Sequence, residues 1–193
     1  MQTILLLKSA FLCVSRFFGL SSFDTVTTLI LSRLASFLPF FEVIPEIYCK
    51  YAYFIEKGIL RAYWVVDGEE YTTSFGAEGC IVFSMDELYY NKKSEEYVET
   101  LEEVEAYRIN ISDLKNLMET NLELCNWGRI IHQNEYRRLH RSHKERLSLP
   151  AKERYEEFQK QFPEICKKVN LKYIASYLGI TLSTLSRLRS KRP

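Results

Sequence analysis

The feature that most constrains this chain is residues 171–193, where apolar residues repeat with the spacing of two short helices. The first segment places apolar side chains on one helical face, at Leu171, Ile174, Ala175 and Leu178. Gly179 then tolerates the left-handed backbone that ends a helix, and Ile180 fills the corner. The second segment has an inward face at Leu185 and Leu188. This pattern predicts a helix-turn-helix, in which Ala175 is the small residue at the helix crossing.

The second predicted helix has the chemistry of a helix that enters a DNA groove. Thr181 is placed to cap it, since a threonine hydroxyl accepts an amide proton from the first turn. Its expected exposed positions are Leu182, Ser183, Ser186, Arg187 and Arg189. The serines near its start and the arginines further along suit a helix in the major groove. No Asp or Glu occurs after Glu164. A helical hairpin inside a larger domain is the alternative, but it does not need an acid-free second helix.

Charge is divided sharply along the chain. Residues 1–128 contain 10 Lys/Arg and 19 Asp/Glu, whereas residues 129–193 contain 16 and 6, so −9 and +10 sum to the net charge of +1. Only the C-terminal third is therefore suited to meet phosphates. The apolar content of 47% over 193 residues is enough for a real core, and we expect one ordinary domain plus a small one.

Cysteine spacing and the N-terminal composition favour a cytoplasmic protein. The five cysteines are widely separated with no Cys-x-x-Cys pair, so neither a disulfide framework nor a zinc site is expected. Charges interrupt residues 1–41 so often that a membrane span or a signal peptide is not expected there. Amphipathic helices over residues 3–18 and 23–37 are the preferred interpretation. Weak attachment to a membrane or partner is the alternative.

The middle of the chain changes to short strands. Runs rich in Tyr, Val, Ile and Phe occur at Tyr51–Glu56, Ile59–Val66, Glu70–Phe75, Cys80–Phe83, Tyr97–Leu101 and Val104–Ile109. Asp67-Gly68 is the best turn signal, because a two-residue hairpin turn needs positive φ at both positions. Short antiparallel strands separated by glycine turns predict a barrel, roll or sandwich.

Helices are predicted after Ile109. Ser112 can cap one that runs to Glu119, and Asn121 can start a much longer one that ends at Leu147. A helix of this length spans roughly 39 Å, too long for one small barrel to cover. A second copy of the chain is the expected cover, with close approach at Gly128; a helix lying on its own barrel is the alternative.

A shorter helix follows, preceded by Pro150 and ending before Phe162-Pro163. A short segment over residues 164–169 then leads into the helix-turn-helix. The boundary before the terminal domain is expected between Leu147 and Pro150.

This order of elements resembles the Crp/Fnr superfamily of transcription regulators. The resemblance is carried by Tyr53-Phe54-Ile55-Glu56-Lys57-Gly58-Ile59-Leu60-Arg61, Ser148-Leu149-Pro150-Ala151-Lys152-Glu153-Arg154-Tyr155, Tyr173-Ile174-Ala175-Ser176-Tyr177-Leu178-Gly179-Ile180-Thr181 and Thr184-Leu185-Ser186-Arg187. All but the first stretch are similar to the branch common in Bacteroidetes. The resemblance covers about Tyr51 to Arg192 well and the first 50 residues poorly.

The resemblance implies an α+β fold with three regions. These are N-terminal helices with a cyclic-nucleotide-binding-like antiparallel β-roll over residues 1–120, a dimerisation helix over 121–147, and a DNA-binding domain over 148–193. The family domain is a winged helix, but the sequence ends at Pro193, directly after the recognition helix, so little of a wing is expected. Residues 40–49 lack the glycine turns that the family usually has at the front edge of the roll.

The absence of an arginine bears on which effector the roll could bind. Family members that bind cyclic AMP hold its phosphate with a Gly-Glu pair and an Arg about a dozen residues later, because a buried phosphate needs a guanidinium fork. Here the matching region begins at Phe75-Gly76-Ala77-Glu78, and no Arg occurs between Ala62 and Tyr107. Cyclic AMP is therefore not expected, the effector is unknown and no cofactor is identified.

The resemblance also assigns DNA contacts by position. Leu182, Ser183 and Arg187 match positions that face base edges. Thr181, Thr184 and Ser186 match positions near phosphates. Arg187 is the best candidate for a guanine contact, whereas Leu182 can touch only a thymine methyl. Backbone contacts are assigned to Lys172, Tyr173 and Arg189, with a solvated surface as the alternative for each.

The sequence also bears on two other function classes. An enzyme is not expected, because all three histidines lie on the long helix, which excludes a cupin-type metal site on the strands, and no nucleophile elbow or phosphate loop occurs. An interaction adaptor with a degenerate helix-turn-helix and a structural roll remains the alternative to a homodimeric, sequence-specific transcription regulator on a palindromic site. The expected partner is double-stranded DNA. An interaction with RNA polymerase is left open, and no interaction with a membrane is expected.

Overall fold

The computed structural model describes residues 50–190. The helices predicted over 3–18 and 23–37, and residues 40–49 of the expected roll edge, lie outside these residues. Contacts within these residues define two compact units, residues 50–60 with 76–130 and residues 61–75 with 131–190. We call them the roll unit and the C-terminal unit. The three regions predicted from the sequence stay a prediction.

The roll unit is built on an antiparallel sheet. Its strand order is β4–β1–β6, with bounds β1 (Tyr51–Lys57), β4 (Ile81–Val82) and β6 (Glu105–Asn110). Tyr51 pairs with Asn110 and Phe54 with Tyr107, and the register shifts between Ile55 and Lys57. Phe54 and Ile109 are fully buried, so this sheet supplies part of the roll's apolar core.

The β2–β3 hairpin has the turn that the sequence predicts. The second sheet has the order β3–β2–β5, with bounds β2 (Leu60–Val66), β3 (Glu69–Gly76) and β5 (Tyr97–Thr100). Asp67 and Gly68 have φ of 52° and 81°, the positive values of a two-residue hairpin turn. The boundary between the units crosses both strands, after Leu60 and after Phe75. The π-helical segment η1 (Asp86–Tyr90) was not predicted from the sequence.

Two helices follow β6, and their capping corrects one prediction. α3 (Ile111–Thr120) is capped by Asn110, whose Oδ1 accepts the Ser112 amide proton at 3.0 Å, so the prediction that Ser112 caps it was wrong. Asn110 precedes the first helical residue, which is where a cap must stand. α4 (Leu122–Ser148) begins after Asn121, whose Oδ1 accepts from the Glu123 and Leu124 amides, as predicted.

The first turns of α4 pack on their own roll unit. Trp127 stacks on Phe54 of β1 with ring centroids 6.3 Å apart. A Cβ added at Gly128 would lie 2.6 Å from Met118 Cε on α3. The prediction that Gly128 is where a second copy's backbone approaches was therefore wrong, because that face is already filled by α3.

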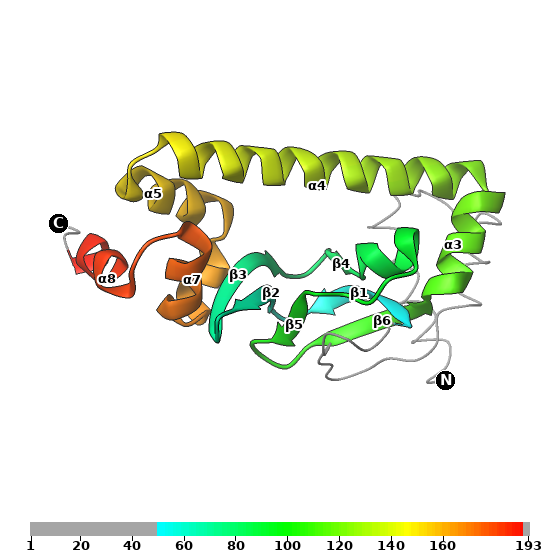
Figure 1. Cartoon of the computed structure of the whole chain (residues 1–193), viewed down its shortest axis with the longest axis horizontal. Helices are drawn as coiled ribbons and strands as arrows, with labels where there is room; N and C mark the ends of the chain where they lie inside the picture. The colour runs from blue at the N-terminus through cyan, green and yellow to red at the C-terminus, as the bar shows by residue number, and fades with distance from the viewer. Residues whose placement is uncertain (1–49, 191–193) are drawn as a thin grey trace, which may run out of the picture. The chain divides into compact units, whose positions relative to one another are not determined.

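The C-terminal unit contains four short helices after α4. Their bounds are α5 (Ala151–Gln161), α6 (Pro163–Lys168), α7 (Leu171–Leu178) and α8 (Leu182–Ser190). Ile174 and Leu185 are fully buried, so α7 and α8 share one small core. The predicted α+β order of antiparallel strands, long helix and terminal helix-turn-helix is confirmed (Figure 1). Within residues 50–190, no helix is long and apolar enough to cross a bilayer.

Gly58 offers a test of the roll's packing. Its φ is +108°, and an added Cβ would lie 2.7 Å from the Glu103 carbonyl oxygen and 2.7 Å from Val104 Cγ2. We expect Gly58→Ala to lower the free energy of unfolding by about 2–4 kcal/mol, from backbone strain plus overpacking. Gly79→Ala is the control, because φ there is +84° with nothing within 4 Å, and it should cost only about 1–2 kcal/mol. Equal urea midpoints for the two variants would contradict the packing described.

Candidate nucleic-acid interface

The turn between α7 and α8 is fixed by hydrogen bonds, of which the sequence predicts the one that Thr181 accepts. Gly179 has φ of 65°, and its amide donates to the Ser176 carbonyl at 3.0 Å. The Ile180 amide donates to the Ala175 carbonyl at 3.0 Å, which closes the corner. Thr181 Oγ1 accepts the Thr184 amide proton at 3.2 Å, so the predicted cap of α8 is confirmed. The crossing of the two helices is thus set by backbone geometry.

The two faces of α8 are clearly separated. Leu185 is fully buried and Leu188 half-buried against the unit's core. The positions expected to face outward are all exposed, at Leu182, Ser183, Ser186, Arg187 and Arg189. Thr181 is exposed and Thr184 is half-buried at the start of the helix, while Lys172 is exposed on α7. The predicted DNA-contact residues of α8 therefore belong to its solvent side.

Arg187 is held only by long hydrogen bonds. Its Nε donates to the Ser183 carbonyl at 3.4 Å and its Nη2 to Thr184 Oγ1 at 3.5 Å. Both distances lie near the outer limit for a hydrogen bond, so little free energy holds the guanidinium on the helix. The fork can exchange these partners for the O6 and N7 acceptors of a guanine.

Tyr173 has a different environment from the other predicted contacts. It is half-buried, and the guanidinium carbon of Arg61 lies 3.6 Å from the centre of its ring. One face of the ring is therefore occupied by a side chain from β2. Sequence reasoning missed Arg61; the available signal was a charged residue within the apolar run from Ile59 to Trp64.

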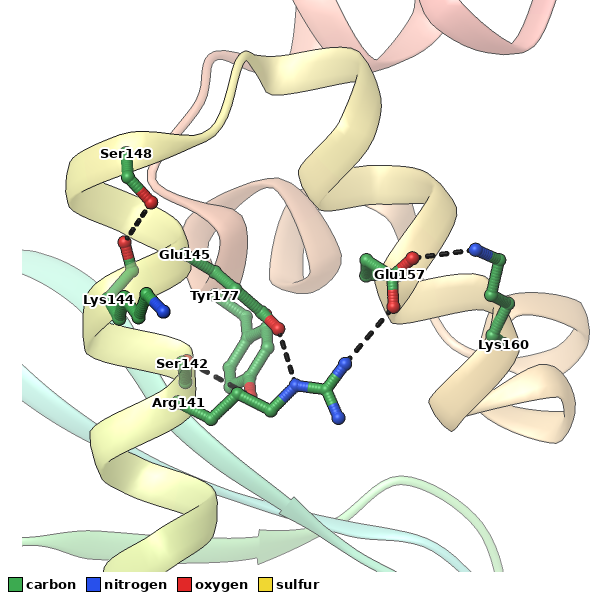
Figure 2. Close-up of polar contacts among 8 residues, drawn as sticks. All are labelled: Arg141, Ser142, Lys144, Glu145, Ser148, Glu157, Lys160 and Tyr177. Carbon is green, nitrogen blue, oxygen red and sulfur yellow. Dashed lines mark hydrogen bonds and ion pairs between the residues drawn. The ribbon is translucent and has the colours of Figure 1, made fainter.

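The last turns of α4 are tied to α5 by ion pairs. Arg141 Nε donates to Glu145 Oε1 at 2.7 Å, and its Nη2 donates to Glu157 Oε2 on α5 at 3.2 Å (Figure 2). Lys160 donates to the other oxygen of Glu157 at 2.6 Å. The hydrogen bond and charge of Lys160, with a smaller contribution from Arg141, lower the pKa of Glu157. This contribution to stability is present above the ordinary glutamate pKa and is lost as the pH falls through the lowered value.

Tyr177 anchors α7 from within. Its ring lies 5.5 Å from that of Phe75 on β3 and 5.3 Å from that of Phe158 on α5, between ring centroids. Its hydroxyl lies 3.5 Å from Ser142 Oγ on α4 (Figure 2). Aromatic pairs at these separations add to the free energy of burial. α7 is therefore held by three different elements of its own unit.

The charge of this region suits a polyanion. From Cys166 to Ser190 the basic residues are Lys167, Lys168, Lys172, Arg187 and Arg189, and no acidic residue offsets them. Lys167 is paired with Glu164 at 2.7 Å, just before this stretch. Over residues 50–190, no group of three or more His, Cys, Asp or Glu could hold a metal ion.

Comparison with known proteins adds to this geometry. No family model matches the sequence, and no curated protein matches it. Solved structures do match. FixK2 from Bradyrhizobium japonicum is 19% identical with a TM-score of 0.67, over 82% of this chain and 84% of that chain. CLP from Xanthomonas campestris is 17% identical with a TM-score of 0.64, over 86% and 89%.

A third structure names the family directly. It is a putative transcriptional regulator of the Crp/Fnr family from Eubacterium rectale, 16% identical with a TM-score of 0.67, over 86% of this chain and 81% of that chain. The chain has the fold of the Crp/Fnr regulators. At this level of identity the similarity establishes the fold, so the resemblance drawn from the sequence is confirmed at that level. The Bacteroidetes branch of the Crp/Fnr family stays a prediction.

The cap of α8 provides a test of the interface geometry. We expect Thr181→Ala to lower the free energy of unfolding by about 1 kcal/mol, because the Thr184 amide loses its acceptor. Hydrogen exchange of the first α8 amides should accelerate. Thr181→Ser keeps the hydroxyl and should behave like the unmodified protein. Unchanged exchange in Thr181→Ala would show that this hydroxyl does not hold the helix start.

Proposed function

We propose that this protein is a sequence-specific DNA-binding transcription regulator of the Crp/Fnr type. The observation that carries the proposal is α8, a capped helix whose outward side contains serines, arginines and one leucine, and no acid. Such a helix fits the major groove, where arginine and small polar side chains read base edges. The fold shared with FixK2 and the Eubacterium rectale regulator supports the same assignment.

Roles within this proposal follow the exposed positions. Leu182, Ser183 and Arg187 face the bases, with Arg187 on a guanine and Leu182 on a thymine methyl. Thr181, Thr184 and Ser186 approach phosphates at the start of the helix, and Lys172 and Arg189 extend the backbone contact. Tyr173 is assigned a backbone contact through the part of its side chain that Arg61 does not cover.

The β-roll is proposed to sense an effector other than cyclic AMP. No Arg between Ala62 and Tyr107 is available to hold a buried phosphate. CLP is described as responsive to c-di-GMP, which shows that one regulator of this fold has a different effector. We propose that the protein is cytoplasmic, because it must reach DNA to act as a regulator. RNA polymerase stays a predicted partner.

We assign the homodimer contact to the outer side of α4. Ser142 and Glu145 line a pocket with Phe158 of α5 and Tyr177 of α7. Helical geometry places Tyr136 and Leu147 on the opposite side of α4. Both are exposed, at 69% and 76%. Leu139 is also exposed beside them. A second copy of α4 would cover these side chains and place two α8 helices for a palindromic site.

The dimer contact can be tested by a charge placed in it. We expect Tyr136→Asp to raise the dimer dissociation constant by at least tenfold in sedimentation equilibrium, because burial of an unpaired carboxylate is unfavourable. Tyr71→Asp is the matched control, since Tyr71 is an exposed tyrosine on the hairpin, at 52%. A Tyr136→Asp protein that remains as dimeric as the control would reject this interface.

The decisive experiment for the function combines selection with salt titration. Fragments bound from a random duplex library would give the operator, and affinity for that operator and for random duplex would then be measured between 50 and 200 mM salt. A regulator that contacts about six phosphates should lose affinity by roughly a thousandfold or more across that range, through counterion release. No enrichment and no salt dependence would favour the interaction adaptor with a structural roll.

Two substitutions separate base reading from phosphate contact. Arg187→Ala should relax base preference at one operator position and cost about 1–3 kcal/mol of binding free energy. Lys172→Ala should weaken binding to all sequences alike and reduce the magnitude of the salt slope by about 1. Arg187→Lys retains the charge without the fork and should still lose the base preference. If Arg187→Ala kept the same preferred operator, the role assigned to that residue would be wrong.

A further inference from the structure

A buried arginine lies where the β2–β3 hairpin meets α7. Arg61 is 1% exposed, yet it carries a full positive charge. A buried charge is costly unless it is paired and hydrogen-bonded. Its Nη2 donates to Glu70 Oε2 at 2.6 Å and its Nη1 to Thr72 Oγ1 at 3.3 Å, both on β3. Glu70 is about one-third exposed, so the pair reaches solvent on one side.

Two tyrosine rings complete the environment of Arg61. Its guanidinium carbon lies 4.1 Å from the ring centre of Tyr63 on β2 and 3.6 Å from that of Tyr173 on α7. A planar guanidinium suits this arrangement, because it can stack on aromatic faces while its edge donates hydrogen bonds. Lysine has no planar group, so it cannot lie flat between two rings and donate a fork of hydrogen bonds from its edge at the same time. Arg61 therefore joins the hairpin to the first helix of the helix-turn-helix through contacts that only arginine can make together.

A second contact ties the same two elements. Ser176 of α7 donates its hydroxyl proton to the Glu70 carbonyl at 3.2 Å and accepts the Thr72 amide proton at 2.9 Å. A helix side chain thus takes the place of a neighbouring strand for two backbone groups of β3. Figure 1 shows the hairpin beside α7. The contact includes both a charged group and backbone groups, so it specifies one docked position.

The connectivity gives this contact a functional meaning. Residues 61–75 belong to the same compact unit as α5–α8, and the chain passes between the units after Leu60, Phe75 and Ile130. Both strands of the hairpin therefore continue into the roll unit, as does α4. The helix-turn-helix is connected to the roll by a two-stranded ribbon as well as by the long helix.

We propose that Arg61 is a positioning residue for DNA binding, which docks the β2–β3 hairpin on α7 and so holds α7 and α8 in the geometry that reads DNA. This rests on the function proposed above. α7 has only eight residues, and a helix of that length depends on tertiary packing for its stability. Loss of the docking would leave α8 correct in sequence but less preorganised, which lowers affinity without removing any contact to DNA.

The test uses the full chain and substitutes one residue on each side of the docking contact. Arg61→Lys acts from the hairpin, and Ser176→Ala acts from α7 without touching a residue assigned to DNA. Each should lower affinity for the selected operator about tenfold, leave the base preference intact and leave the salt slope unchanged, because no phosphate contact is removed. Hydrogen exchange of the α7 amides should accelerate in both.

A control variant tests whether the loss of an ion pair elsewhere in the chain has the same effect. Lys57→Ala removes one positive charge from β1, where Lys57 is exposed and paired with Glu105 at 3.1 Å. It should leave operator affinity within twofold of the unmodified protein. Unchanged or tighter binding by Arg61→Lys would overturn the positioning role, as would a changed base preference in either variant.

A double-substitution cycle separates this inference from the proposed function. Urea unfolding of Arg61→Lys, Ser176→Ala and the combined variant should give losses that are less than additive, because both substitutions break one docking contact. If the losses are less than additive but the protein binds no DNA, the docking contact is supported and the proposed function as a transcription regulator is rejected. Additive losses would reject the docking contact. In either case, the positioning role of Arg61 is overturned.

Discussion

Packing of the short helix α7 is the constraint on which the C-terminal unit depends. One side of α8 is exposed to solvent. On its other side Leu185 is fully buried, as is Ile174 of α7. α7 cannot supply this support alone, since eight residues give too few hydrogen bonds to persist in water. Tyr177 fixes it to α4 and α5, and Ser176 and Tyr173 fix it to the hairpin. The position of α8 therefore depends on these contacts of α7.

Two elements, α4 and the β2–β3 hairpin, continue along the chain from the roll unit into the C-terminal unit. The exposed ion pairs of Arg141 lie near the end of α4, and the buried guanidinium of Arg61 lies on the hairpin. Exposed pairs are weak and screened by salt, whereas a buried stacked arginine is costly to leave unpaired.

Local sequence patterns predicted much of this structure, and long-range contacts account for what they missed. The strands, the Asp67-Gly68 turn and the Asn121 and Thr181 caps all follow from residues within a few positions of one another. Arg61 was missed because its partners Tyr173 and Glu70 meet only in the fold. Gly128 was misassigned for the same reason, since nothing near it in sequence indicates that Met118 fills its open side.

The most direct test of the account is a hydroxyl-radical footprint of the full chain on a duplex selected for binding. We predict protection of the backbone in two patches on one face of the duplex, with centres about one helical turn apart, as two symmetric reading helices require. A single unpaired patch would contradict the dimer. A cleavage pattern identical to that of naked DNA at every tested protein concentration would contradict the assignment of α8 as a DNA-reading helix.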